Sequence, residues 1–474
     1  MGDRTQLYVG GKWVEPAGPD TITVVNAATE EPLASVPAGS REDVDRAVAA
    51  ARDAFDGWSA TSLEDRLACM ERLHAGLVDR IEDVGRLIAE EVGMPLASAT
   101  VIQGGVPAAI VKSFIDLARV FPWEEPAGAS TIVREPVGVA AAITPWNYPL
   151  FQAACKAGAA LTAGCTMVLK PSEIAPRASF ALADAVHEAG FPPGVFNLVS
   201  GHGPVAGEAL VAHPGVDMVS FTGSTATGRR IAALAAQELK RVTLELGGKS
   251  ASLILDDADL EEAVDATVRQ TFLNSGQTCM AWSRLIVPRP YHDEAARIAR
   301  KVAEQLVVGD PLAEGTDIGP VASSQHRDKV RRYIRLGMEE GATLVTGGPE
   351  PPDGFDRGYY VRPTVFADVT NDMSIAIEEI FGPVVVIIPA EDDDDAVRIA
   401  NESAYGLHGA VFSRDKARAE RVARRLRTGQ VDVCGVGGFN VAAPFGGYKQ
   451  SGRGRELGRF GLEEYLEVKA LALP

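Results

Sequence analysis

The chain has 474 residues, 46% of them hydrophobic, so its length fits about three domains and its composition fits a large core. The formal net charge is −18 and no dense Lys/Arg run occurs, which excludes a nucleic-acid partner bound through its phosphates. Five cysteines without CxxC spacing favour a reduced cytoplasmic protein and exclude a disulfide scaffold or a zinc site. The longest apolar tract, Ala153–Leu169, is interrupted by Lys156 and by glycines, so no membrane span is expected there.

The opening third of the chain is predicted to be mainly helical after a short β-rich start. Leu7–Val14 is typical of a hairpin, because two strand-forming runs flank a Gly-Gly pair. Ile22–Val25 is a further candidate strand. Ser40 then precedes an amphipathic run that ends near Phe55, which predicts a capped helix. Further helices are expected over Ser62–Arg80, Ile81–Val92 and Gly105–Val120.

Two strand-like segments stand apart from the rest of the pattern. Trp123–Pro136 is predicted to form a projecting hairpin, and Tyr465–Leu471 is predicted to form a strand near the end of the chain. Isolated strands with apolar faces need partners. Two alternatives follow: these edges join copies of the chain, or the two segments pair with each other within one chain.

The middle of the chain alternates between strands and helices. Four apolar runs, each followed by a turn and a helical pattern, predict a doubly wound parallel sheet. Ligands bind such sheets at the carboxyl ends of the strands, so the turns after these runs are candidate binding segments. The predicted strands are Val137–Thr144, Thr166–Lys170, Val195–Val199 and Met218–Phe221.

A carboxylate and a thiol follow the parallel strands. Glu245 stands beside a Gly pair at the end of the strand-like run Arg241–Leu244, and Cys279 lies in a polar turn. The helical segment Leu260–Leu273 between them is expected to return the chain towards the strand that it left, so that both side chains face one pocket. A thiol nucleophile and a carboxylate base suit such a pair. The alternative for a lone cysteine is an inert buried residue.

A second α/β domain is predicted after Cys279, because the alternation of strands and helices resumes there. Its expected elements are strands Arg284–Val287, Thr343–Val345, Val384–Ile388, Ala410–Ser413 and Val431–Val433, and helices His292–Leu306, Gln325–Glu340, Asp394–Ala400 and Lys416–Arg427.

Three turns carry side chains suited to a nucleotide and a reacting carbonyl. Gly223–Gly228 opens a helix after an apolar strand, which suits a phosphate, although it is neither a Walker loop nor GxGxxG. Lys170 and Glu173 at another strand end suit ribose hydroxyls. Asn147, between two prolines, suits an oxyanion. The alternatives are a simple turn, a carboxylate that favours a helix dipole, and an Asx-turn, respectively.

Seven motifs occur in an order that resembles the NAD(P)-dependent aldehyde dehydrogenase superfamily over essentially the whole chain. They are Thr144-Pro145-Trp146-Asn147, Leu169-Lys170-Pro171-Ser172-Glu173, Phe221-Thr222-Gly223-Ser224-Thr225, Leu244-Glu245-Leu246-Gly247-Gly248-Lys249, Gly276-Gln277-Thr278-Cys279, Glu378-Glu379-Ile380-Phe381-Gly382-Pro383 and Pro444-Phe445-Gly446-Gly447-Tyr448-Lys449.

The resemblance implies an aldehyde-dehydrogenase-like α/β fold in three parts. A Rossmann-type cofactor-binding domain is expected over 1–122 and 138–246, and a second α/β catalytic domain over 247–446. The hairpin 123–137 and the tail 460–474 match a small β oligomerisation element. A homodimer or homotetramer is therefore expected.

The resemblance also assigns site residues. Cys279 matches the nucleophile, Glu245 the general base, and Asn147 the oxyanion donor together with the backbone N–H of Cys279. Glu245 is expected to be partly desolvated with a raised pKa, because an ordinary carboxylate is a weak base at neutral pH. The cofactor is expected to be NAD, with NADP less favoured because Glu173 would repel a 2′-phosphate. No metal ligand set is found. The cofactor-binding residues are expected to be Ile143, Pro145, Trp146, Lys170, Ser172, Glu173, Gly203, Gly207, Phe221, Gly223, Ser224, Gly228, Leu246, Glu379 and Phe381.

The substrate pocket of the family maps onto mostly apolar residues, so the implied substrate is a small-molecule aldehyde that is uncharged and aliphatic or aromatic. Cys155 stands where betaine-aldehyde types carry Trp, and no obvious Arg is available for a substrate carboxylate. Three alternatives remain: a CoA-acylating relative, a catalytically retired ligand-binding member, and a thioesterase or esterase without cofactor. The expected lining is Tyr148, Phe151, Cys155, Thr278, Met280, Phe439 and Phe445.

Overall fold

The structure is a computed structural model that describes residues 2–435, 437 and 439–472. Residues 473–474 of the expected oligomerisation tail lie outside the described residues. The predicted start of the chain is confirmed: β1 (Leu7–Val9) and β2 (Lys12–Val14) form a hairpin, and Gly10 and Gly11 turn it with φ of 60° and 77°. Ser40 caps α1 (Arg41–Ser59) through a capping box with Asp43.

The helices of the opening third are also confirmed, and β3 (Thr21–Val25) pairs with a strand that the sequence pattern did not indicate, β4 (Pro32–Pro37). One helical stretch, Leu96–Val120, is long and apolar enough to cross a membrane by length and composition. Half of its most apolar part is buried inside the fold. The core helix of a globular protein can have the same length and composition. The other elements are α2 (Leu63–Val78), α3 (Ile81–Val92), α4 (Leu96–Ser98), the π-helical Ala99–Gly105 and α5 (Val106–Val120).

The predicted doubly wound sheet is present, with strand order β19-β11-β10-β7-β8-β9-β1-β2. The chain steps from β7 to β8 and β9 on one side, and then returns to place β10 and β11 on the other side of β7. The carboxyl ends of β7 and β10 are therefore a topological switch point, where a ligand crevice is expected. The elements are β7 (Val139–Ile143), α6 (Pro149–Ala163), β8 (Thr166–Lys170), α7 (Arg177–Ala189), β9 (Phe196–Leu198), α8 (Glu208–Ala212), β10 (Met218–Thr222), α9 (Thr225–Ala235), β11 (Arg241–Glu245) and β19 (Gly452–Arg453).

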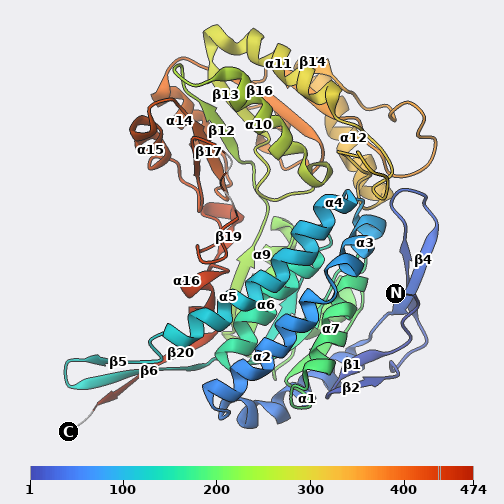
Figure 1. Cartoon of the computed structure of the whole chain (residues 1–474), viewed down its shortest axis with the longest axis vertical. Coiled ribbons are helices and arrows are strands. Elements are labelled where there is room, and N and C mark those ends of the chain that lie inside the picture. Colours follow the sequence, from blue (N-terminus) through green and yellow to red (C-terminus); the bar gives the residue numbers. More distant parts are fainter. Residues whose placement is uncertain (1, 436, 438, 473–474) are drawn as a thin grey trace.

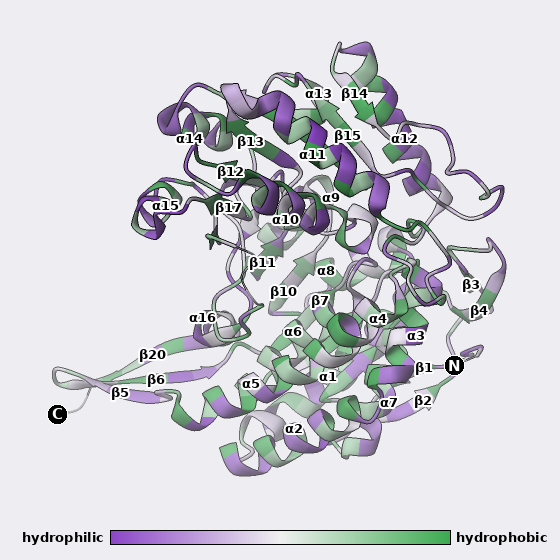
Figure 2. Ribbon diagram, turned by 45° about the horizontal axis from the view of Figure 1, so that its top comes forward, coloured by the Kyte–Doolittle hydropathy of each residue, from purple (hydrophilic) through white to green (hydrophobic). Residues whose placement is uncertain are grey.

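A second sheet, with order β14-β15-β16-β13-β12-β17-β18, follows in the chain. In Figure 2 its strands are largely green, whereas its outer helices α11 and α12 are mostly purple, as expected of a buried sheet covered by amphipathic helices. The elements are β12 (Ala251–Ile254), α10 (Leu260–Phe272), β13 (Arg284–Pro288), α11 (His292–Gln305), α12 (Ser324–Glu339), β14 (Thr343–Thr346), β15 (Thr364–Ala367), α13 (Ser374–Ile377), β16 (Val384–Ala390), α14 (Asp393–Asn401), β17 (Gly409–Phe412), α15 (Lys416–Ala423) and β18 (Asp432–Val433).

The predicted route from Glu245 to Cys279 was wrong in one respect. Glu245 ends β11 in the first sheet, but α10 follows β12, which lies in the second sheet. The helix therefore returns the chain along the second sheet and not to the strand that carries Glu245. β12 escaped prediction because its run of only four residues, Ala251–Ile254, starts directly after the Gly-Gly-Lys-Ser turn.

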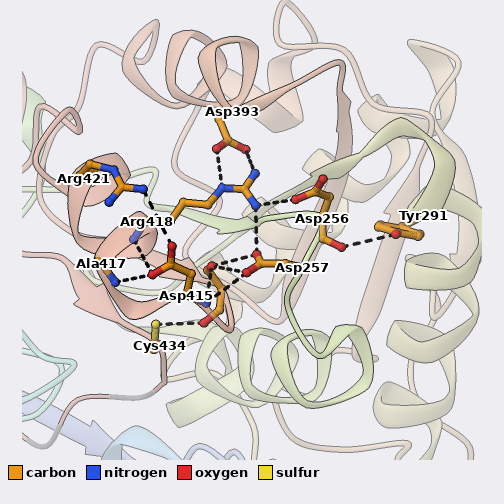
Figure 3. A network of polar contacts seen from close by, with 10 residues as sticks. Asp256, Asp257, Tyr291, Asp393, Asp415, Ala417, Arg418, Arg421 and Cys434 are labelled. Carbon is orange, nitrogen blue, oxygen red and sulfur yellow. Dashed lines mark hydrogen bonds and ion pairs between the residues drawn. The ribbon is translucent and has the colours of Figure 1, made fainter.

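An ionic network around Arg418 of α15 lies at the carboxyl ends of the second sheet (Figure 3). Its guanidinium donates to Asp393 at 2.8 and 2.9 Å and to Asp256 at 2.6 Å, and Asp257 accepts a further bond at 3.2 Å. These carboxylates follow β12 and β16, so the network lies at the carboxyl edge of the second sheet. The opposite edge, where the chain enters β12 and β13, carries Gly248 and Cys279.

A three-stranded arm projects from the body (Figure 1). β20 (Leu466–Ala472) pairs antiparallel with β6 (Ser130–Pro136), which pairs with β5 (Glu124–Ala127). Of the two alternatives for these segments, the structure shows pairing within one chain. β20 and β5 are the edges of this sheet within the described part of the chain.

Candidate active site

The predicted nucleophile lies in a tightly held loop. Asn274 and Ser275 adopt left-handed φ of 53° and 57° just before it, and Cys279 itself is half-buried. Burial raises the pKa of the Cys279 thiol, and the carboxylates of Glu379 and Glu245 raise it further. The resting side chain is therefore a protonated thiol that needs a proton acceptor to become a nucleophile.

Hydrogen bonds from Gln277 hold this loop. Its Oε1 accepts from the backbone N–H of Ala322 at 2.8 Å, and its Nε2 donates to the carbonyl of Asn274 at 3.0 Å. The Nδ2 of Asn274 donates in turn to the carbonyl of Asn147 at 3.1 Å. The thiol loop and the Asn147 turn are thereby fixed relative to each other.

Asn147 is buried just beyond the end of β7. Its Nδ2 donates to the carbonyl of Gln277 at 2.9 Å, two residues before Cys279. The backbone carbonyl of Asn147 also accepts a hydrogen bond from Nε2 of Gln103 at 3.0 Å. An amide nitrogen carries two hydrogens, so one N–H of Asn147 remains for an oxygen bound beside the thiol.

Glu245 is a buried carboxylate, 4% exposed, and neither of its oxygens accepts a hydrogen bond from the described residues. Burial raises the pKa of Glu245 well above its usual value, Glu456 raises it further, and Lys156 and Arg455 oppose the rise. A Cβ atom at Gly446 would lie 2.6 Å from Oε1, so only glycine leaves room for the carboxylate there. Both oxygens are therefore free to accept a proton from water.

An ion pair that the sequence reasoning missed lies beside Glu245. Lys156 and Glu456 are both buried and paired, and Nζ of Lys156 also donates to Oγ1 of Thr222 at 2.8 Å. Because Thr222 accepts this bond, its own hydroxyl donates to Oε1 of Gln152 at 3.1 Å. The sequence points to this ion pair only through Lys156, which stands inside an apolar helical tract. There the lysine indicates no more than that the tract does not cross a membrane.

Polar side chains gather at the switch point of the first sheet. Lys170, at the end of β8, donates through Nζ to Glu173 at 3.3 Å, and His202 lies 3.8 Å from the other oxygen of Glu173. Although burial alone would raise it, the pKa of Glu173 is lowered by Lys170, by hydrogen bonds and by His202. Glu173 is therefore ionised at neutral pH.

The neighbouring turn opens α9. Ser224 caps this helix by accepting from the N–H of Thr227 at 3.2 Å, and the other first-turn N–H groups remain available to an anion. A Cβ atom at Gly228 would meet Leu246 at 2.5 Å, so glycine permits close packing of the helix on β11. The helix N-terminus and the lysine supply donors and the ionised carboxylate supplies an acceptor, a combination that fits a dinucleotide with a free 2′-hydroxyl.

Most of the predicted cofactor residues lie along this one edge. They occupy the ends of β7, β8, β10 and β11 or the turns and helix starts that follow β7, β8, β9, β10 and β11. Glu379 and Phe381 come instead from the loop before β16. Oε1 of Glu379 accepts from the N–H of Gly248 at 3.0 Å, and the rings of Trp146 and Phe381 meet edge to face at 5.5 Å. This loop thus joins the two sheets at the site.

The predicted substrate residues are brought together beside the thiol. Tyr148, Phe151, Cys155 and Phe445 belong to one buried apolar cluster, and Cys279 and Met280 pack against it. The rings of Phe151 and Phe439 lie 5.0 Å apart, and the hydroxyl of Tyr148 lies 2.8 Å from Oγ1 of Thr278. Phe439 is 40% exposed, so this aromatic wall runs from the half-buried thiol towards solvent.

The two sheets and the site between them define an aldehyde-dehydrogenase-like α/β fold. A model of the aldehyde dehydrogenase family matches residues 13–471. The 3-succinoylsemialdehyde-pyridine dehydrogenase of a Pseudomonas species is 49% identical over 472 residues, which is 99% of this chain and 99% of that protein.

Solved structures agree. A mutant of aldehyde dehydrogenase C from Pseudomonas syringae, in complex with NAD+ and octanal, is 47% identical, with a TM-score of 0.98 over 99% of this chain and 96% of that one. A Mycobacterium tuberculosis aldehyde dehydrogenase in complex with NAD+ is 41% identical, with a TM-score of 0.97 over 100% and 99% of the two chains. The chain belongs to the aldehyde dehydrogenase family, and it is an aldehyde-oxidising enzyme.

Proposed function

We propose that the enzyme oxidises uncharged aliphatic or aromatic aldehydes to carboxylic acids, with water as the final acyl acceptor. NAD is the cofactor, in agreement with the solved relatives that hold NAD+. The observation that carries the proposal is the unpartnered buried carboxylate of Glu245 near the thiol of Cys279. A base without hydrogen-bond partners is suited to take a proton from water, which a CoA-acylating enzyme does not require.

The first half-reaction forms a bond between Cys279 and the substrate. The thiol loses its proton to bulk water, the sulfur of the resulting thiolate bonds to the aldehyde carbon, and the carbonyl oxygen becomes an oxyanion. The free N–H of Asn147 and the backbone N–H of Cys279 hold this oxyanion. Bound NAD+ supplies the hydride acceptor. Cys279 then carries the acyl group as a thioester.

The second half-reaction releases the acid. Glu245 takes a proton from water, and the oxygen of that water bonds to the thioester carbon. Asn147 again holds the oxyanion, and the C–S bond then breaks to give the carboxylic acid and free Cys279. The ion pair of Lys156 and Glu456 fixes the electrostatic surroundings of Glu245 during both steps.

The wall beside the thiol supports an uncharged substrate. Tyr148, Phe151 and Phe439 present successive aromatic rings, and a carboxylate tail laid against them would lose its hydration without gaining a partner. One relative is named for an aldehyde that carries a pyridine ring, and one solved relative holds octanal. Both names agree with an apolar aliphatic or aromatic tail.

Reduced-nicotinamide formation with a panel of aldehydes tests this function. Octanal and a pyridine or benzene aldehyde should give a higher kcat/KM than betaine aldehyde or succinic semialdehyde. Acid should form without CoA, and added CoA should not accelerate turnover. Turnover that requires CoA, or ester hydrolysis that NAD neither supports nor changes, would overturn the proposal.

Glu173 is expected to set the preference for NAD over NADP. Replacing it by glutamine removes the charge that repels a 2′-phosphate while retaining the shape of the side chain. The ratio of kcat/KM for NAD to that for NADP should fall by about tenfold or more, since tenfold corresponds to about 1.4 kcal/mol. Glu208→Gln, which alters an exposed carboxylate paired with Arg230, is the matched control. An unchanged ratio in Glu173→Gln would contradict the assignment.

We further propose that residues 1–122 and 138–246 carry the cofactor, 247–446 the thiol, and 123–137 with 460–474 an oligomer contact. A groove of about 1160 Å³ between β11, α9 and β20 supports a homo-oligomer. Three apolar side chains in it are strongly exposed: Leu239 (93%), Val468 (66%) and Phe460 (53%). Exposed apolar patches of this kind mark interaction surfaces.

Light scattering after size exclusion tests this assembly. The natural chain should have at least twice the 50.1 kDa mass of one chain. Val468→Asp should shift it towards the monomer, because a charge on the edge strand β20 opposes burial. Val307→Asp, at an exposed valine outside the groove, should not do so. A monomeric natural chain would refute the proposal.

A further inference from the structure

Gln103 is a buried side chain that contacts the turn at Asn147, and no motif of the sequence marked it. It lies in the π-helical segment Ala99–Gly105 between α4 and α5. Its Nε2 donates to the backbone carbonyl of Asn147 at 3.0 Å, and because a carbonyl can only accept, this bond fixes which end of the Gln103 amide faces the turn. π-helical turns inside α-helices are frequent at functional sites, so this segment is a candidate for a role in the reaction.

The π-helical segment is packed closely against α3. A Cβ atom at Gly104 would lie 2.4 Å from the carbonyl oxygen of Ile81, and one at Gly85 would lie 2.8 Å from Cα of Thr100. Any larger residue at either position would displace the neighbouring backbone, so the two glycines permit this close approach. Because the two elements pack as one unit, the backbone of Gln103 has little freedom to move.

The same unit also contacts the loop that carries the thiol. Val92, the last residue of α3, accepts through its carbonyl from Nε2 of Gln277 at 3.4 Å. The turn of Asn147 and the loop of Cys279 are therefore both tied to one packed element. Asn147 is tied through Gln103, and Cys279 is tied through Gln277.

The backbone carbonyl of Asn147 is held from two sides. Nε2 of Gln103 donates to it from the π-helical segment, and Nδ2 of Asn274 donates to it from the thiol loop at 3.1 Å. A carbonyl oxygen has two lone pairs, so these two bonds use its full accepting capacity. One bond alone would let the turn rotate about this oxygen, whereas two bonds from different elements fix its orientation. The direction of the free N–H of the Asn147 side chain follows from that orientation.

We propose that Gln103 is a positioning residue that holds the carbonyl of Asn147 and thereby directs the free N–H of the Asn147 side chain at the oxyanion. The inference rests on the proposed function, since it requires that Asn147 binds the oxyanion. Oε1 of Gln103 accepts no hydrogen bond from the described residues, so its bond to Asn147 is the contact through which it acts. Both half-reactions form an oxyanion, so loss of Gln103 should slow both.

Single-turnover kinetics of the full-length enzyme with octanal and NAD+ test this role. Gln103→Met keeps a side chain of similar length but removes the donor. Its rates of reduced-nicotinamide formation and of acid release should each fall about tenfold, less than the roughly 10²–10³-fold expected when Asn147→Ala removes the whole oxyanion donor. The Kd for NAD+ in a calorimetric titration should stay within about twofold. Thr162→Val, which removes a buried unpartnered hydroxyl of α6, is the matched control and should behave like the natural enzyme.

A double-mutant cycle separates positioning from a general structural role. If Gln103 acts through the Asn147 side chain, adding Gln103→Met to Asn147→Ala should slow the reaction by less than about twofold more. Gln103→Asn, which withdraws the donor by one methylene group, is a milder second variant and should slow both steps in the same way.

The outcomes distinguish this inference from the function on which it rests. A further tenfold loss in the double variant would overturn it, because Gln103 would then act elsewhere. Natural single-turnover rates in both Gln103→Met and Gln103→Asn would overturn it as well, as would an equal loss of rate and of NAD+ binding with a lower Tm. Natural rates in Asn147→Ala would instead refute the oxyanion role of Asn147.

Discussion

Replacing Cys279 by alanine is expected to abolish aldehyde oxidation, with a loss of about 10⁴-fold or more in kcat/KM. The reason is that no other thiol can take its place. Cys155 is buried within α6, where burial and nearby carboxylates raise the pKa of its thiol well above the usual value, and the other described cysteines lie outside the site. Reduced-nicotinamide formation with octanal is the measurement.

Two control measurements show whether the loss of activity is specific to the thiol of Cys279. Cys279→Ala should still bind NAD+ in a calorimetric titration, because the crevice at β7, β8 and β10 is formed by other residues. Cys434→Ala, at an exposed cysteine, should retain full activity. Residual activity of Cys279→Ala within about a hundredfold of the natural enzyme would exclude this thiol as the nucleophile.

The sequence predicted those parts of the fold that depend on local pattern. Ser40 before an amphipathic run, Gly10-Gly11 between apolar strands, and the apolar run Val139–Ile143 each contain the signal for their own structure. The family motifs then located the aldehyde dehydrogenase fold, which the relatives confirm. The short strands β12, β15 and β19 were missed because their stability comes from sheet partners and not from their own few residues.

Parts of the site were not predictable for a similar reason. Some side chains contribute to the site through partners that lie far away in the sequence. Glu456 is 300 residues from its partner Lys156, and Phe381 is 55 residues from its partner His326. Nothing in the surrounding residues of a lone lysine or histidine indicates which carbonyl or carboxylate it will meet. Only the packing of α6 and α12 against the loops supplies that information.

Replacing Glu245 by glutamine is expected to separate the two half-reactions. The amide has the same shape but cannot take a proton from water, so thioester hydrolysis should slow by about 10²–10⁴-fold. A rapid burst of reduced nicotinamide, close to one equivalent per site, should precede this slow steady state. Hydroxylamine, a nucleophile that needs no base, should restore part of the turnover. Glu402→Gln, an exposed carboxylate paired with Arg398, should behave like the natural enzyme.

The pH profile provides a second test of the same carboxylate. Burial raises the pKa of Glu245 well above its usual value, so the side chain is protonated, and useless as a base, at any pH below that raised pKa. Steady-state kcat of the natural enzyme should therefore rise with pH through a midpoint well above that of an ordinary glutamate. The rising limb should be lost from the steady state of Glu245→Gln. The burst rate, which reports the raised pKa of Cys279, should still increase with pH in that variant. A steady-state limb that survives unchanged in Glu245→Gln would assign the base to another group, because a glutamine does not titrate.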